Sequence, residues 1–282
     1  MRGGGGVVVG YDRSESSEAA VRWAAAEARL RGVPLTVVHA WDLFPAVGPY
    51  SVPADDLLAA GEHIVAEGGA HAREETGDVH TVIGRGGATT VLMEAAAGAD
   101  LVVVGSRGRG GFAGLVLGST AASLASHAPA PVVVVRDHPA EGPVVVGVDG
   151  SPASLEALGL AFAEAALRGA DVVALAAWPR EVEVGPAPLV DAESLREFAG
   201  ERLARLVAPW SEKYPGLRVR TAVLTGEPRE VLLDAAVDAG LLVVGSRGLG
   251  GFRSMLLGSV GQALLHHASS PVLVARPPRD AG

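Results

Sequence analysis

This 282-residue chain has no cysteine and a single lysine, Lys213. Without cysteine there can be no disulfide, no thiolate nucleophile and no Cys-ligated zinc site. A phosphate-binding loop of the Walker type needs a lysine directly after its glycines, and Lys213 lies far from any glycine cluster. P-loop ATPase chemistry is therefore excluded.

Positive charge, aromatic residues and long apolar runs are also scarce. The formal net charge is −9, which argues against an extended nucleic-acid-binding surface. No apolar run approaches the roughly 18–20 residues that a membrane span needs, and the N-terminal MRGGGG has no apolar stretch of signal length. These features predict a cytoplasmic protein that binds neither nucleic acid nor membranes.

Glycine, in contrast, is abundant and arranged in a repeat. The stretch GSRGRGGFAGLVLGST at residues 105–120 returns as GSRGLGGFRSMLLGSV at residues 245–260. In both copies a glycine, two residues, a second glycine, nine residues and a third glycine are followed by serine. The repeat divides the chain into two similar halves, which we expect to be domains of residues 1–138 and 139–282.

Short apolar runs alternate with helical patterns in each half, which predicts an α/β fold. The first half has expected strands at 7–10, 35–40, 79–83, 101–104 and 131–135, and the second half repeats them. Strands that alternate with helices form parallel sheets covered on both faces. We expect Ser14 and Ser151 to cap the first helix of each half, and Ser119 and Ser259 to cap the helices after the glycine loops.

Several candidate site residues follow the strands directly. In an open parallel sheet, ligands bind beyond the carboxyl ends of the strands, where the strand order reverses. The residues at these ends are Gly10, Asp12, Ala40 and Gly105 in the first half, and Gly147, Asp149, Ala177 and Gly245 in the second. Asp12 and Asp149 could accept hydrogen bonds from a ribose or help to hold a metal on phosphates; the alternative is that they only cap the following turn.

The glycine loops are the strongest candidates for phosphate binding. Glycine lets the main chain approach a ligand closely, and the N–H groups between a strand and the next helix then point outward. The alternative is a tight turn in which the glycines serve geometry alone. Arg107 and Arg247 either reach the phosphates or stay in solvent. Ser119 and Ser259 are expected to bind phosphate and not to act as nucleophiles, because no base is evident beside them.

One series is present twice in the chain: a strand, Asp12, Gly105-x2-Gly108-x9-Gly118-Ser119 and a closing strand. This series resembles the universal stress protein family in its tandem, ATP-binding form. The resemblance covers residues 7–136 and 143–276. It implies two tandem Rossmann-like domains, each a five-stranded parallel sheet of order 3-2-1-4-5 with helices on both faces. It further implies that ATP, with or without Mg²⁺, or a related adenine nucleotide is the ligand.

The resemblance also implies a role for each matching residue. Asp12 and Asp149 would hold the ribose, and the main chain at Ala40 and Ala177 would pair with adenine. The phosphates would be held by Gly105, Gly108, Arg109, Gly118, Ser119 and Thr120, and in the second copy by Gly245, Gly248, Leu249, Gly258, Ser259 and Val260. Leu249 stands in place of Arg109 and Val260 in place of Thr120. If the main chain dominates, both sites bind; if side chains matter, the first binds more tightly.

The function implied by the resemblance is that of a stress-response protein acting as a nucleotide-dependent regulatory or interaction module. No residue stands out as catalytic or as a metal ligand, so we expect slow ATP hydrolysis at most. The alternatives are a nucleotide hydrolase or transferase of the same fold and a nucleotide-free interaction protein. Family members pair through their fifth strands, which implies a pseudo-dimer within the chain, a homodimer of chains and a protein partner that the sequence does not name.

Overall fold

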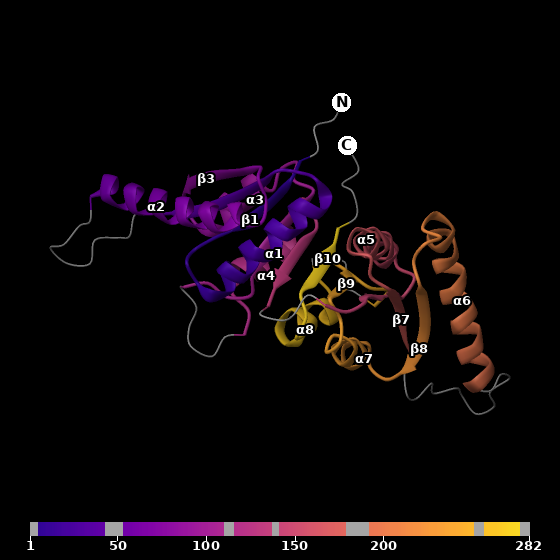
Figure 1. The fold of residues 1–282 in the computed structure, drawn as a ribbon. Helices are drawn as coiled ribbons and strands as arrows, with labels where there is room; N and C mark the ends of the chain where they lie inside the picture. Colours follow the sequence, from indigo (N-terminus) through magenta and orange to yellow (C-terminus); the bar gives the residue numbers. More distant parts are fainter. Residues whose placement is uncertain are drawn as a thin grey trace, which may run out of the picture. The chain divides into compact units, whose positions relative to one another are not determined.

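The computed structural model describes residues 5–42, 53–109, 116–136, 141–178, 192–250 and 257–276. The chain forms two compact units, Met1–Asp137 and His138–Gly282, and each is an α/β structure (Figure 1). Within the described ranges, no helix is both long and apolar enough to cross a lipid bilayer.

In its described residues, the first unit is a five-stranded parallel sheet covered by four helices. Its elements are β1 (Val7–Gly10), α1 (Glu15–Arg31), β2 (Leu35–Trp41), α2 (Ala54–Arg73), β3 (Val79–Arg85), α3 (Ala88–Ala95), β4 (Leu101–Gly105), α4 (Ser119–His127) and β5 (Val132–Val135). The strand order is β3-β2-β1-β4-β5. Helix α1 packs against α2, and α3 packs against α4, so that each pair covers one face of the sheet.

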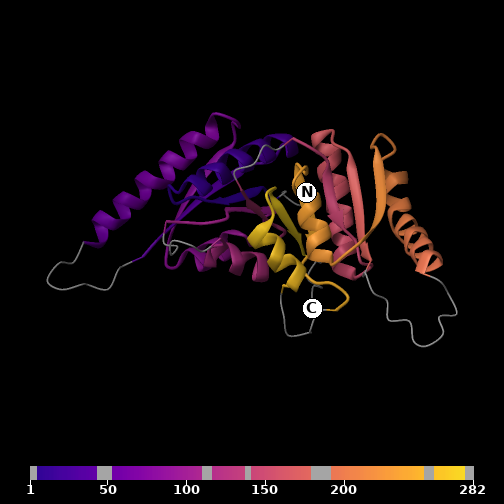
Figure 2. The ribbon, with the colours of Figure 1, turned by 90° about the horizontal axis from the view of Figure 1, so that it is seen from below.

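The second unit repeats this arrangement. Its elements are β6 (Val144–Gly147), α5 (Pro152–Arg168), β7 (Val172–Trp178), α6 (Ala192–Lys213), β8 (Val219–Thr225), α7 (Pro228–Ala235), β9 (Leu241–Gly245), α8 (Ser259–His267) and β10 (Val272–Ala275). The order is β8-β7-β6-β9-β10 and all pairs are parallel. Figure 2 shows α6 alongside β8. The predicted fold class, with strand order 3-2-1-4-5 in two tandem domains, is confirmed.

Small aliphatic side chains fill both cores, as the low aromatic content predicts. The valines of β1 and β5 are at most 4% exposed. The second core has one aromatic cluster: Phe162 of α5 is fully buried, and its ring lies 6.2 Å from that of Trp210 and 6.0 Å from that of Tyr214 on α6. These contacts hold α6 on α5.

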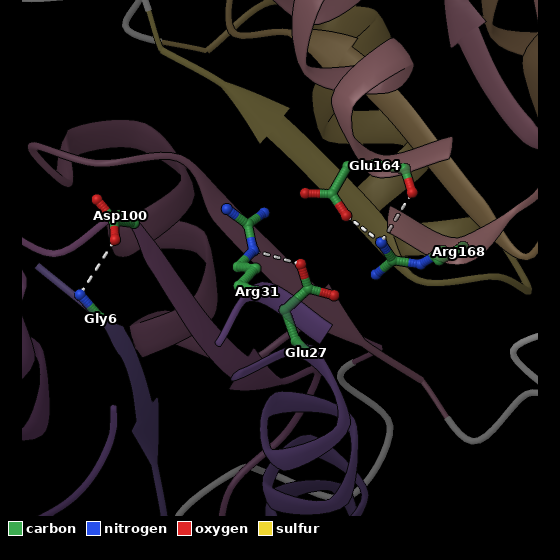
Figure 3. A network of polar contacts seen from close by, with 6 residues as sticks. All are labelled: Gly6, Glu27, Arg31, Asp100, Glu164 and Arg168. Carbon is green, nitrogen blue, oxygen red and sulfur yellow. Dashed lines mark hydrogen bonds and ion pairs between the residues drawn. The ribbon is translucent and has the colours of Figure 1, made fainter. Parts of the chain in front are cut away.

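Each unit also buries one carboxylate on its first helix. Glu27 of α1 is 1% exposed and Glu164 of α5 is fully buried. Each pairs with an arginine one turn later on the same helix, Arg31 and Arg168 (Figure 3). A buried charge is costly unless it is paired, so these arginines make the burial of the carboxylates tolerable.

The predicted N-caps are correct for the first helix of each half and wrong for the helix after each glycine loop. The hydroxyls of Ser14 and Ser151 accept hydrogen bonds from Ser17 N and Ser154 N, both at 3.2 Å, so these two caps are confirmed. The prediction that Ser119 and Ser259 are N-caps is wrong: both are the first helical residues, and Gly118 and Gly258 are the N-caps.

The reason for this difference lies in the main chain of the glycine loop. Gly118 N donates to Ser106 O at 2.7 Å, which holds the glycine against the end of β4, and Gly118 O accepts the first helical bond from Ala122 N at 3.0 Å. Gly258 N donates to Ser246 O in the same way, at 2.9 Å. The glycine therefore already occupies the capping position, and no side chain is needed to cap the helix.

Replacement of Phe162 by alanine tests the aromatic cluster. We expect Phe162→Ala to lower the free energy of unfolding of the second unit by about 3–5 kcal/mol, because the cavity cannot close fully. Urea denaturation followed by tryptophan fluorescence measures this loss. Leu155→Ala, on the same helix at a position 36% exposed, is the control and should cost far less. Equal losses in the two variants would contradict the assigned role of Phe162.

Candidate functional site

The predicted site residues of each half converge at the carboxyl ends of three adjacent strands. In the first unit these strands are β2, β1 and β4, and the strand order reverses between β1 and β4. Gly10 and Gly147, which end β1 and β6, leave room for a neighbouring helix: an added Cβ would lie 3.0 Å from Leu92 and 2.9 Å from Leu232. Packing therefore accounts for these two glycines without a ligand.

Asp12 joins the end of β1 to the glycine loop. Its Oδ1 accepts hydrogen bonds from Ser14 N at 3.0 Å and Ser14 Oγ at 2.6 Å. Its Oδ2 accepts a hydrogen bond from Arg109 N at 2.9 Å. The carboxylate thus caps the turn, which was one of the two readings of the sequence, and also binds the loop that follows β4.

Asp149 makes the same connection in the second half. Its Oδ1 accepts from Ser151 N and its Oδ2 from Leu249 N, both at 2.8 Å. The exchange of Arg109 for Leu249 leaves this bond intact because the donor is a main-chain N–H group. The link between the acid and the loop is therefore independent of the side chain at this loop position.

Both carboxylates are held in the ionised form. Burial acts to raise the pKa of Asp12, but the hydrogen bonds from Ser14 and from the main chain of Arg109 outweigh it and bring the pKa below its usual value. Burial opposes the same shift at Asp149, where Ser151 and the main chain of Leu249 lower the pKa. Each half therefore carries a negative charge directly beside its glycine loop.

The glycines of the loop serve different purposes. A Cβ at Gly105 would lie 2.5 Å from the main chain of Ser16, and one at Gly245 would lie 2.6 Å from that of Ala153, so helix packing requires both. A Cβ at Gly108 or Gly248 would lie 2.6 Å from Oδ2 of Asp12 or Asp149. These two glycines give the carboxylates access to the loop.

The main-chain N–H groups of the loop divide into those bound to protein acceptors and those with no acceptor in the described part of the chain. Arg109, Gly118 and, through Ser16 Oγ, Arg107 donate to protein atoms. Among the described residues, no acceptor is bound to the N–H groups of Gly108, Ser119 and Thr120. The same holds for Gly248, Ser259 and Val260 in the second half. These groups are the donors left for a ligand.

The side chains of Arg107, Arg109, Arg247 and Leu249 are exposed around these donors. Arg136, directly after β5, is a residue that the sequence reasoning did not single out. Burial lowers the pKa of its guanidinium, and the charge of Arg107 lowers it further, so the two groups lie near each other. The sequence contained one signal for Arg136: an arginine, Arg276, also follows the second closing strand.

The main chain of Ala40 and Ala177 faces the same space. In β2, Val38 O accepts a hydrogen bond from Tyr11 N at 2.9 Å, so Ala40, two residues later, directs its N–H and C=O toward the same side, beyond the end of β1. In β7, Leu175 O accepts from Val148 N at 2.8 Å, which orients Ala177 likewise. Each half thus presents a main-chain donor and acceptor next to its aspartate.

The first half has a polar cluster that the sequence reasoning missed. The hydroxyl of Tyr11 donates to Glu67 of α2 at 3.2 Å, and Arg13 donates to the same carboxylate through Nε at 2.8 Å and through Nη2. Burial and Glu67 raise the pKa of Tyr11 to about 12. Nothing in the sequence indicates that Glu67, far along α2, faces the turn after β1.

The described histidines and acids do not gather into a metal site. Within the described ranges, no three His, Cys, Asp or Glu residues are placed to hold a metal ion. Both oxygens of Asp12 and of Asp149 already accept hydrogen bonds. His39 of β2 is half-buried, and its Nδ1 lies 2.8 Å from Tyr11 O. The described residues therefore do not form a Mg²⁺ site of their own.

Comparison with known proteins gives one family. Residues 6–136 and 142–276 each match the Universal stress protein family. A universal stress protein of Mycobacterium tuberculosis is 39% identical over 288 residues, covering 96% of either chain. One of Mycolicibacterium smegmatis is 40% identical over 292 residues, covering 96% of this chain and 97% of its own.

A similar fold has been solved. The crystal structure of a universal stress protein from Archaeoglobus fulgidus has a TM-score of 0.73 at 18% identity, and the match covers 98% of this chain and 97% of that one. At 18% identity, this similarity establishes the fold alone.

The lowered pKa values of Asp12 and Asp149 predict a loss of stability in acid. A carboxylate whose pKa is lower in the folded than in the unfolded chain stabilises the fold above its unfolded pKa, and this contribution disappears as the pH falls through the folded pKa. We expect the unfolding free energy of the wild type to exceed that of the double variant Asp12→Asn, Asp149→Asn near pH 6, and the gap to shrink below about pH 4.

Urea denaturation at a series of pH values measures this gap. Asp78→Asn, whose side chain is 65% exposed, is the matched control and should differ little from the wild type at any pH. A gap between wild type and double variant that stays constant down to about pH 3 would show that the two carboxylates are not held in the way described.

Proposed function

The chain belongs to the universal stress protein family, and on that premise and the geometry of its two sites we propose that each half binds one adenine nucleotide, with ATP as the ligand. The chain would then act as a nucleotide-dependent regulatory or interaction module in a stress response. The observation that carries the proposal is the set of main-chain N–H groups at Gly108, Ser119 and Thr120 that have no acceptor among the described residues, a set repeated in the second half.

These donors suit phosphate oxygens. Ser119 and Thr120 are the first residues of α4, where the helix dipole adds positive potential to the free N–H groups. The hydroxyls of Ser119 and Thr120 can donate to the same ligand, and Arg107 and Arg109 supply charge from the loop. In the second half Ser259 and Val260 offer the same main-chain groups at the start of α8.

Asp12 retains capacity for a ribose hydroxyl. A carboxylate oxygen can accept two hydrogen bonds, and Oδ2 of Asp12 accepts only one among the described residues, from Arg109 N. Oδ2 of Asp149 likewise accepts only the bond from Leu249 N in the described part of the chain. A ribose at this position would lie between the loop and the main chain of Ala40 or Ala177, which offers adenine a donor and an acceptor.

The same site is poorly equipped for turnover. A general base works best when its pKa lies near the working pH, whereas the pKa of Asp12 and that of Asp149 are below the usual carboxylate value. This supports binding with slow hydrolysis at most, and we assign no catalytic residue. A homodimer, a cytoplasmic location and a protein partner remain predictions from the family resemblance.

Disruption of one loop at a time tests the assignment. An alanine Cβ at position 108 or 248 would displace the carboxylate from the loop N–H, so we expect Gly108→Ala and Gly248→Ala each to lose the nucleotide of its own half. Calorimetric titration with ATP should find two bound nucleotides in the wild type, one in each single variant and none in the double variant.

The control for these variants is Gly77→Ala. An added Cβ at Gly77 meets nothing within 4 Å, and the residue lies between α2 and β3, away from the site. It should bind as the wild type does. Retention of both nucleotides by the folded double variant, or the absence of binding to the wild type at millimolar ATP, would refute the proposed function.

A further inference from the structure

We propose that Arg202 of α6 is a ligand-binding residue of the second nucleotide site, where its guanidinium supplies positive charge beside Asp149. This inference rests on the proposed function and adds to it, because Arg202 is on a helix outside the glycine motif. Arg202 would act on the nucleotide through its positive charge, without any change of the fold.

The two loops differ in charge at the position whose main chain binds the aspartate. Arg109 and Leu249 both donate their N–H to that carboxylate, but only Arg109 brings a guanidinium there. Leu249 is 66% exposed, so it gains no packing to offset the exchange. The second site therefore lacks a guanidinium at this position.

Arg202 brings a guanidinium to the second site from another element. The residue after Asp149 is Gly150, and a Cβ added there would lie 2.5 Å from Nη2, 3.3 Å from Cζ and 3.6 Å from Nε of Arg202. The guanidinium therefore covers the turn that carries the site's aspartate. Gly150 has a φ of 87°, which glycine adopts without strain, and a side chain at this position would displace the guanidinium of Arg202.

The corresponding turn of the first half has a different residue and a different partner. Arg13 stands in the place of Gly150, with a φ of 65°, and its guanidinium is bound by the carboxylate of Glu67 through Nε and Nη2. That charge is compensated within the unit. Arg202 is exposed, and within the described part of the chain no ion pair or hydrogen bond joins it to a carboxylate. Its charge is thus available to a ligand, and that of Arg13 is not.

The consequence is that the second site has a cation on α6, next to Asp149, whereas Arg13 at the corresponding turn of the first half is bound by Glu67. Because Arg202 is exposed, its attraction for a nucleotide is screened by salt. The second site should therefore owe part of its affinity for ATP at low ionic strength to Arg202.

Titration of single-site chains with ATP tests this. In the Gly108→Ala background, where only the second site remains, we expect Arg202→Gln to weaken ATP binding about threefold to tenfold at low salt. The loss should shrink at high salt. In the Gly248→Ala background, where only the first site remains, Arg202→Gln should leave the affinity unchanged.

Arg205→Gln is the matched control in both backgrounds. It removes an exposed arginine from the same helix, one that lies 4.0 Å from Glu201. Thermal unfolding of each variant checks that the second unit remains folded. If the Gly108→Ala chain binds ATP and Arg202→Gln changes neither the affinity nor its salt dependence, the inference is wrong while the proposed function stands. If no chain binds ATP, both fail.

Discussion

The bond between the aspartate after the first strand and a main-chain N–H of the glycine loop is the constraint on which both sites depend. It exists because the strand order places β1 beside β4 and β6 beside β9. The carboxylate fixes the start of the loop, and Gly118 N on Ser106 O fixes its end. In the described part of each loop, a short row of N–H groups is left without an acceptor, and the two anchors on either side fix their position.

The two halves keep this frame while their side chains diverge. Ser16 holds both main-chain polar groups of Arg107, but the corresponding residue of the second half is Ala153, which has no hydroxyl. Ser151 Oγ still donates to Arg247 O at 3.2 Å, so one tie to the loop is retained. Main-chain donors and acceptors are present whatever the side chain, which is why the exchange of Arg109 for Leu249 leaves the bond to the aspartate unaltered.

Most of the fold and part of the site could be predicted from the sequence. Apolar runs followed directly by Asp12 or by glycine identified the strand ends, and the family resemblance supplied the strand order. The cap at Gly118 could not be foreseen, because serine is a common N-cap and the bond to Ser106 O depends on the path of the loop. The reason for Gly105 was likewise hidden, since the main chain that it contacts belongs to a helix distant in the sequence.

The least predictable features involve α2 and α6, because the segments before these helices differ in length between the halves and leave the helical register free. Glu67 faces Arg13 in one half, and Arg202 faces Gly150 in the other. A residue on these helices can therefore reach the turn that carries the aspartate although the repeated sequence motif does not indicate the contact. Since the glycine loop and the aspartate are fixed by the main chain, the neighbouring helix is the element through which one copy of the repeat can acquire a different charge without disturbing the frame.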